Sequence, residues 1–215
     1  MLVTALMTIT DPDILGLFPL DLVLLPGERV PLHIFEPRYR ALVADCVLTP
    51  AEFVLPRVVE DAITRVACAA RVESVTRRFA DGRMNIVVRG TRRVQISLAE
   101  GDEPYLTGLV EDLPDERDEA DDAVRGRVAE AFNGYMAKVA AGRRAVTSMD
   151  VPYSYALAAQ LPLDPSLKQF LVEERSETKR LVALLAVLDQ ALRALDESEG
   201  ADEPTGDDGR TTVPE

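Results

Sequence analysis

Hydrophobic positions in the first half of the chain alternate with polar ones at the period of two that is typical of β-strands. The dipeptides Pro26-Gly27 and Asp81-Gly82 predict tight turns, and Gly90-Thr91 predicts a break between two strands. The strand-like runs are short and fall at residues 31–35, 53–59, 66–75, 84–88, 94–98 and 105–110. This spacing predicts a small antiparallel β-barrel or sandwich over residues 14–113.

One short helix interrupts the β-pattern. Pro37 suits the first position of a helix, where its missing N–H would have no partner. After it, apolar residues recur at helical spacing, namely Tyr39, Leu42, Val43 and Cys46. We therefore predict one helix inserted among the strands.

The second half has a helical period and predicts a small helical bundle over residues 114–195. One helix begins after Pro114 and ends at Gly142, and a short one spans residues 152–160. Asp164 predicts an N-cap, with Pro165 after it, for a helix that buries Leu167, Phe170 and Leu171. Ser176 predicts the cap of the last helix, whose apolar stripe holds Leu181, Leu184, Leu185, Leu188 and Leu192.

The two ends lack such patterns. Residues 1–13 show no periodicity and predict a poorly ordered leader, in which Met7 is a second possible start. Residues 196–215 are rich in Asp, Glu, Gly, Thr and Pro, which predicts an acidic disordered tail. The net charge of −13 is concentrated in that tail and in residues 111–122, each with eight acids and one Arg. The rest of the chain is close to neutral, so the net charge says little about the folded surface.

Composition is that of a globular protein, with 47% hydrophobic and 28% charged residues in 215. The two cysteines, Cys46 and Cys68, lie in apolar contexts, which predicts buried thiols in a reducing compartment. The N-terminus has no basic region typical of a signal peptide, and the apolar runs are too short to span a membrane. We expect a cytoplasmic protein that does not bind membranes.

The search for catalytic motifs finds no phosphate-binding glycine loop, no GxSxG elbow and no HExxH pair. His33 is the only histidine, and its apolar strand context favours a hydrogen-bonded structural role. We predict no catalytic residues, no metal and no cofactor. The alternative, a hydrolase, would need Ser, His or Lys side chains that converge in one pocket.

Residues 65–93 hold eight arginines and only two acids. On one face of a sheet such arginines would contact phosphates, an alternative that names Arg77, Arg78, Arg83, Arg92 and Arg93 as nucleic-acid contacts. Phe79 is the only aromatic there, which is poor for base stacking. We favour solvent-facing arginines that the acidic linker, residues 111–122, partly neutralises, and we do not expect nucleic acid as the partner.

Residues 17–40, LFPLDLVLLPGERVPLHIFEPRYR, strongly resemble the opening of the Lon protease N-terminal, substrate-binding domain. Residues 81–94, DGRMNIVVRGTRRV, are similar to the β-hairpin of that family and the strand after it. Residues 104–111, 159–164 and 169–174 are similar to its last strand and its helical part. The resemblance covers about residues 14–195.

The resemblance implies an α+β fold, in which a PUA-like antiparallel β-barrel with one short inserted helix precedes a small α-helical bundle. It implies a non-catalytic recognition or adaptor protein that binds unfolded or tagged polypeptides. Because the sequence ends before the ATPase and protease domains of Lon, we expect a stand-alone form whose partner is a separate ATP-dependent protease. The oligomeric state is left open.

The motif residues have a structural and a functional interpretation. In the first, Phe18, Leu32, Ile34 and Phe35 pack the barrel, and ion pairs of Glu36, Arg38 and Arg40 fix the junction of strand and helix. In the second, Leu25, Pro26 and His33 form an apolar groove with the seam between barrel and bundle, where an extended chain binds. We assign the structural role to Phe18, Pro19, Gly27, Phe35, Glu36, Pro37, Arg38, Tyr39 and Arg40.

Overall fold

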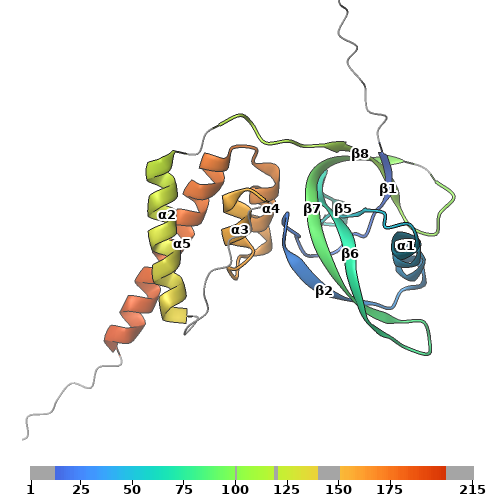
Figure 1. Ribbon diagram of the computed structural model, residues 1–215, viewed down its shortest axis with the longest axis horizontal. Coiled ribbons are helices and arrows are strands. Elements are labelled where there is room, and N and C mark those ends of the chain that lie inside the picture. The colour runs from blue at the N-terminus through green and yellow to red at the C-terminus, as the bar shows by residue number, and fades with distance from the viewer. Residues whose placement is uncertain (1–12, 100, 119–120, 140–150, 202–215) are drawn as a thin grey trace, which may run out of the picture.

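The computed structural model describes residues 13–99, 101–118, 121–139 and 151–201, and its sheet and helices lie side by side (Figure 1). The predicted leader up to residue 12, the predicted end of a helix at Gly142 and the tail from residue 202 lie outside these ranges. The fold is α+β: an antiparallel sheet comes first and a group of helices follows.

The longest strand, β7 (Met84–Ala99), organises the sheet. Along one side it pairs with β6 (Val66–Arg78). On its other side the first half pairs with β2 (Arg29–Ile34) and the second half with β8 (Thr107–Asp112). β1 (Asp13–Gly16) pairs with β8, and β3 (Phe53–Leu55) pairs with β6. A separate small hairpin joins β4 (Val58–Val59) to β5 (Ala62–Ile63).

The two ends of this sheet meet. Leu17, just after β1, forms a parallel bridge with Val54 of β3, and the N–H of Phe18 donates to the carbonyl of Val54 at 2.8 Å. The sheet therefore curls toward a barrel, and the isolated parallel bridges Leu17–Val54 and Leu20–Arg57 connect its two ends.

The predicted break at Gly90 is wrong, because β7 continues through it. The backbone of the 25–28 turn approaches there: the N–H of Gly90 donates to the carbonyl of Glu28, and the N–H of Gly27 donates to the carbonyl of Gly90. A Cβ at position 90 would lie 2.2 Å from the carbonyl oxygen of Leu25. The glycine thus marks a close approach between two backbones, a use of glycine that leaves the strand intact.

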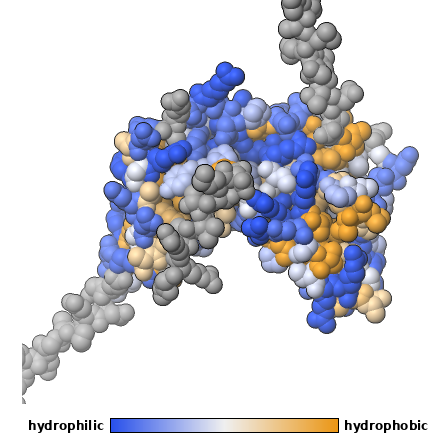
Figure 2. Space-filling model, in the orientation of Figure 1, coloured by the Kyte–Doolittle hydropathy of each residue, from blue (hydrophilic) through white to orange (hydrophobic). Residues whose placement is uncertain are grey.

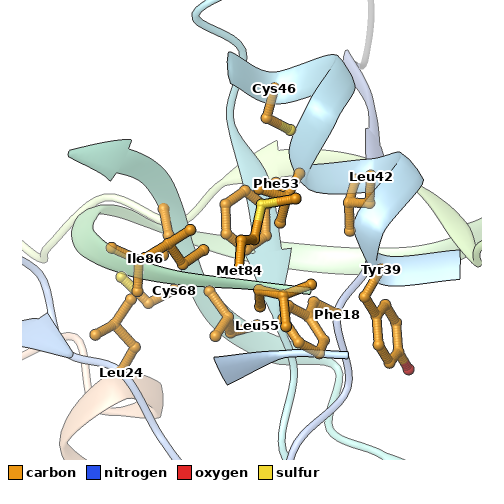
Figure 3. Packing of buried hydrophobic residues seen from close by; sticks show 14 residues of the cluster. Phe18, Leu24, Tyr39, Leu42, Cys46, Phe53, Leu55, Cys68, Met84 and Ile86 are labelled. Carbon is orange, nitrogen blue, oxygen red and sulfur yellow. The ribbon is translucent and has the colours of Figure 1, made fainter. Parts of the chain in front are cut away.

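The helix α1 (Pro37–Leu48) lies against the sheet and buries the four residues predicted from its spacing. Phe18 stacks on Tyr39 with ring centroids 4.1 Å apart, inside a core that also holds Ile34 and Met84 (Figure 3). Leu32 is partly buried against the same core. The prediction that Phe35 packs this core is wrong, since its side chain is 59% exposed.

Both thiols are buried and free, as predicted. Cys46 lies in the core of Figure 3, where burial raises its pKa to about 11. Burial likewise raises the pKa of Cys68. Neither thiol is therefore poised to act as a nucleophile at neutral pH.

The described residues of the second half form four helices: α2 (Asp122–Val139), α3 (Tyr153–Ala158), α4 (Pro165–Glu173) and α5 (Glu177–Ala201). α2 and α5 lie side by side, and α3 and α4 lie between them and the sheet (Figure 1). Their core includes Phe132, Tyr155, Leu171 and Leu181. The predicted burial of Phe170 is wrong, because α4 turns Gln169 and Val172 inward and leaves Phe170 41% exposed.

α5 extends beyond its predicted end at residue 195 to Ala201. Lys138 at the end of α2 forms a salt bridge of 3.0 Å with Asp196 on this added turn. Acidic residues that predict disorder in an isolated segment are compatible with helix when a helix already leads into them. None of the described helices is long and apolar enough to cross a membrane.

Side-chain caps begin two of these helices. Asp164 accepts from the N–H groups of Ser166 and Leu167, as predicted. At α5 the predicted cap, Ser176, accepts from the N–H of Lys179 at 3.2 Å. Asp118 of the acidic linker adds to this cap, because its carboxylate accepts from the Ser176 hydroxyl and from the N–H of Thr178.

The capping carboxylate of Asp118 makes stability depend on pH. Its hydrogen bonds from Ser176 and from the Thr178 N–H lower the pKa of its carboxyl group from 3.8 to about 2. The stabilisation is therefore complete above about pH 5 and is lost as pH falls toward 2. We expect Asp118→Ala to lower the free energy of unfolding by about 1 kcal/mol at pH 7.

Urea unfolding of the wild type and Asp118→Ala between pH 7 and pH 2.5 measures this effect. The difference between the two proteins should shrink as the pH falls below about 5. Glu116→Ala, an exposed acid of the same linker, is the control and should change stability little. A difference that stays constant with pH would contradict the capping role.

Candidate functional site

The residues predicted to form one groove lie at two places. Leu25 is fully buried in the core of the helical half, and Pro26 is buried beside it. His33 is exposed near the other end of β2. Pro26 lies in the turn before β2, and within the strand Arg29 and His33 are roughly 13 Å apart at about 3.3 Å per residue. The structure therefore does not bring Leu25, Pro26 and His33 together in one groove.

The seam between the sheet and the helices contains shallow hollows around Pro26. One of about 250 Å³ is lined by Gly27, Val151, Tyr155 and other residues of the 26–29 turn and of the segment 151–160. Gly27 has a φ of +80°, and a Cβ there would lie 3.0 Å from Val151. The turn thus packs closely against the helical half.

Buried polar contacts hold this seam together. Arg93 of β7 donates to the carbonyls of Val172 and Glu174 in the helical half, at 3.0 and 2.8 Å. It also forms an ion pair with Asp115 of the linker. Arg180 of α5 binds the other oxygen of Asp115 at 2.6 Å. These contacts at the seam therefore have a structural role, because they hold the sheet and the helical half together.

A different surface gathers around His33. In the sheet, Asn85 of β7 lies directly opposite His33 of β2 on one side and opposite Arg77 of β6 on the other. Directly opposed residues point to the same face of a sheet, so these three side chains form a row across three strands. Two side chains of the row are hydrogen-bonded to each other: Nδ1 of His33 and Oδ1 of Asn85 are 2.6 Å apart. Since the amide oxygen accepts, Nδ1 donates to it.

Aromatic and cationic side chains cover this row. His33 lies 6.1 Å from the ring of Phe35 in a stacked arrangement and 5.9 Å from Phe79, edge to face. The guanidinium groups of Arg77 and Arg83 lie over the Phe79 ring at 4.6 and 5.3 Å. We call these five residues, His33, Phe35, Phe79, Arg77 and Arg83, the aromatic tip. They lie where β2 ends and where the β6–β7 hairpin turns, at the end of the sheet that extends away from β8 (Figure 1).

Exposure makes the aromatic tip a candidate interaction site. An aromatic ring that is 59% exposed, as Phe35 is, leaves a large apolar surface in water. Such surfaces beside charged groups commonly mark binding sites. Figure 2 shows apolar surface over the sheet half of the molecule, beside hydrophilic side chains at the end of the hairpin.

The family-motif residues lie next to the tip, and one of them, Arg40, is hydrogen-bonded to the hairpin turn. Glu36 and Arg38 form a salt bridge of 2.8 Å at the start of α1, where Pro37 occupies the first turn. Nη1 of Arg40 donates to the carbonyl of Asp81 at 2.7 Å and so attaches α1 to the hairpin turn. The stacked rings of Phe18 and Tyr39 lie below, with Pro19 half-buried in the segment before the 25–28 turn.

The five arginines of the nucleic-acid alternative do not form one face. Arg93 is buried at the seam, so it is not available to phosphates. Arg92 binds Glu52 at 2.9 Å and also Asp112 of the acidic linker. Arg83 pairs with Asp81 at 2.7 Å, and Arg77 lies on Phe79. Only Arg78 of the five extends from the hairpin without a described partner.

The described residues contain no group of three His, Cys, Asp or Glu side chains that could hold a metal ion. The single histidine binds an asparagine amide, and its neighbours are aromatic rings and guanidinium groups. This arrangement offers stacking, cation–π contacts and charge, which are means of binding.

Comparisons with known proteins agree with the fold. The family model of the ATP-dependent protease La (LON) substrate-binding domain matches residues 14–190. A Lon N-terminal domain protein from Xanthomonas campestris is similar in structure, with a TM-score of 0.63 and 28% identity over 81% of this chain and 98% of that one. The N-terminal domain of Mycobacterium avium complex Lon protease is similar too, with a TM-score of 0.63 and 25% identity over 82% of this chain and 98% of that one. A search of curated protein sequences gave no significant match.

Proposed function

Because the chain belongs to the family of the ATP-dependent protease La (LON) substrate-binding domain, we propose that it binds polypeptides without catalysing a reaction, and that the aromatic tip is its binding surface. The observation that carries the proposal is the exposed ring of Phe35 beside His33. A polypeptide recognised for being unfolded presents apolar side chains and free backbone. An exposed aromatic anchor in a rigid frame suits such a ligand.

The charge around the aromatic tip indicates which polypeptides it would bind most tightly. Four arginines lie around the tip, Arg40, Arg77, Arg78 and Arg83, against the two acids Glu36 and Asp81. Arg38 instead lines a hollow with Asp102 and Glu103. The surface is therefore net positive. It favours segments in which an apolar or aromatic residue has acidic neighbours.

We also propose that the bound polypeptide passes to an ATP-dependent protease on a separate chain. The support is the likeness to an N-terminal domain of a Lon protease, in which the two parts are named as one protein. Adding this protein to a purified Lon-type protease should speed the degradation of a polypeptide that the tip binds. An unchanged rate would reject this partner and leave the binding proposal standing.

Fluorescence anisotropy tests the binding surface. The probe is fluorescein-labelled α-lactalbumin that has been reduced and carboxymethylated, so that it stays unfolded. We expect Phe35→Ala to weaken binding at least tenfold, because truncation of an aromatic anchor removes about 1.4 kcal/mol or more. Phe170→Ala is the matched control, since it removes the same exposed ring from α4, far from the tip in Figure 1.

Three outcomes of this experiment would contradict different parts of the proposal. Binding that Phe35→Ala leaves unchanged would remove the aromatic tip as the site. Equal losses in the two phenylalanine variants would indicate nonspecific apolar contact. If the wild type binds no unfolded polypeptide, or binds only RNA in a salt-sensitive way, polypeptide recognition itself is rejected.

A further inference from the structure

The strand that carries His33 has one unpaired edge. Among the described strands β2 pairs only with β7, although it is six residues long and regular. An edge strand presents a row of backbone N–H and C=O groups that another extended chain can pair with. The aromatic tip lies at the C-terminal end of this edge.

The register shows which groups point outward. The N–H of Gly90 donates to the carbonyl of Glu28, so the 28–90 pair is hydrogen-bonded. In an antiparallel ladder bonded pairs alternate with non-bonded ones, which makes the bonded residues of β2 Val30, Leu32 and Ile34. The backbone groups of Arg29, Pro31 and His33 therefore point away from β7. Pro31, which has no N–H, agrees with this register because a bonded position would need that donor.

The side chains follow the same alternation. Residues 29, 31 and 33 are exposed on the outer face, whereas residues 30, 32 and 34 turn toward the core. A strand added beside β2 would extend the row Arg77–Asn85–His33 by one residue, which would lie next to the imidazole of His33. The residue two positions further along the added strand would share this face and lie near the ring of Phe35.

We propose that the bound polypeptide adds as an extended strand to the outer edge of β2, with backbone hydrogen bonds to His33 and to the carbonyl of Pro31. An apolar side chain of the ligand contacts Phe35, and an acidic one lies within reach of His33, Arg77 and Arg83. Backbone pairing supplies affinity that does not depend on sequence, as a protein that binds many unfolded chains requires. The proposal rests on the aromatic tip being the binding surface.

Pro31 sets the length of this pairing. Proline on an edge strand usually limits pairing between sheets. Here it removes one donor, which separates the outward groups of Arg29 from the carbonyl of Pro31 and both backbone groups of His33. The expected ladder is therefore short and centred on His33, next to the aromatic side chains, and a long β-ribbon between two copies is disfavoured.

Substitution of His33 by proline tests the backbone contact. The change removes the outward N–H of His33 and leaves the ladder with β7 intact, as Pro31 already does two residues earlier. His33→Ala is the control, because it removes the imidazole and keeps the N–H. We expect His33→Pro to bind a labelled peptide about fivefold or more weakly than His33→Ala, from the loss of one backbone hydrogen bond.

The probe is a fluorescein-labelled ten-residue peptide that alternates Thr with apolar residues and carries one Phe with an Asp two residues away on each side, so that the Phe and Asp side chains share one face of the strand. A second measurement uses the wild-type protein and this peptide with one backbone nitrogen methylated at a time. Strand addition predicts that methylation weakens binding at every second position of the paired segment and is tolerated between them, since only alternate N–H groups face β2. Because the methylated peptides are measured with the wild-type protein, this series tests strand addition even if His33→Pro fails to fold.

Each result decides one question. Equal affinity of His33→Pro and His33→Ala, or losses on methylation without a period of two, would overturn strand addition. If Phe35→Ala still abolished binding of the same peptide, the aromatic tip would remain the binding surface. If the peptide bound equally to the wild type and Phe35→Ala, the proposed function at this surface would fail instead.

Discussion

Replacing Arg180 with alanine is expected to lower the free energy of unfolding by about 3–5 kcal/mol, the usual range when one partner of a buried ion pair is removed. The side chain of Arg180 is fully buried. It binds Asp115 at 2.6 Å and Glu177 at 2.7 Å, and it donates to the Ser154 hydroxyl at 2.9 Å. Its guanidinium group also lies 4.6 Å from the centre of the Tyr155 ring.

The size of this effect comes from the groups that would be left behind. Without Arg180, the carboxylate of Glu177 stays buried with only the N–H and hydroxyl of Ser154 as donors. Asp115 would retain its ion pair with Arg93 and lose its second guanidinium partner. A buried charge with incomplete hydrogen bonding costs more than the removed contact was worth.

Urea unfolding, followed by circular dichroism, measures the change. Lys179→Ala is the matched control: the neighbouring cation is two-thirds exposed, its pair with Glu174 is 3.7 Å long, and its loss should cost under about 0.5 kcal/mol. Arg180→Met fills more of the volume and should still be strongly destabilising, because the carboxylates stay uncompensated. A loss below 1 kcal/mol for both Arg180 variants would show that the network adds no stability.

The network explains why the predicted charge pattern was only partly informative. The sequence shows an acidic linker and an arginine-rich segment, and we predicted that one neutralises the other. Asp112 and Asp115 do pair with Arg92 and Arg93. Burial of Arg93 could not be read from the sequence, because its neighbour Arg92 has the same charge and a partly exposed side chain. Only the docking of the helical half distinguishes the two.

The motif residues show a second limit of prediction from the sequence. Two-residue alternation places Ile34 on the inner face of β2, which puts His33 and Phe35 on the other face. We predicted both Ile34 and Phe35 inside because both are apolar, and the alternation was the better guide. Phe79 and Asn85 were not predicted as site residues. They join His33 through strand register across the hairpin, which a single sequence does not reveal.

Replacing Gly90 with alanine is expected to lower the free energy of unfolding by about 3 kcal/mol, at the upper end for added volume in a packed interior. The new Cβ would lie 2.2 Å from the carbonyl oxygen of Leu25 and 3.0 Å from the sulfur of Cys68. The first neighbour is backbone in a turn that hydrogen-bonds to Gly90 on both its N–H and its C=O. The clash can be relieved only by separating the 25–28 turn from β7.

Gly126→Ala is the control, because we expect it to raise the free energy of unfolding instead of lowering it. Gly126 lies within α2, and a Cβ there would have no neighbour within 4 Å. Alanine is the better helix former, so this change should stabilise the protein by up to about 1 kcal/mol. The two variants add the same methyl group, and thermal unfolding should move their midpoints in opposite directions. Equal shifts would mean that the approach of the 25–28 turn to β7 does not hold the start of β2, the strand that leads from the seam to the aromatic tip.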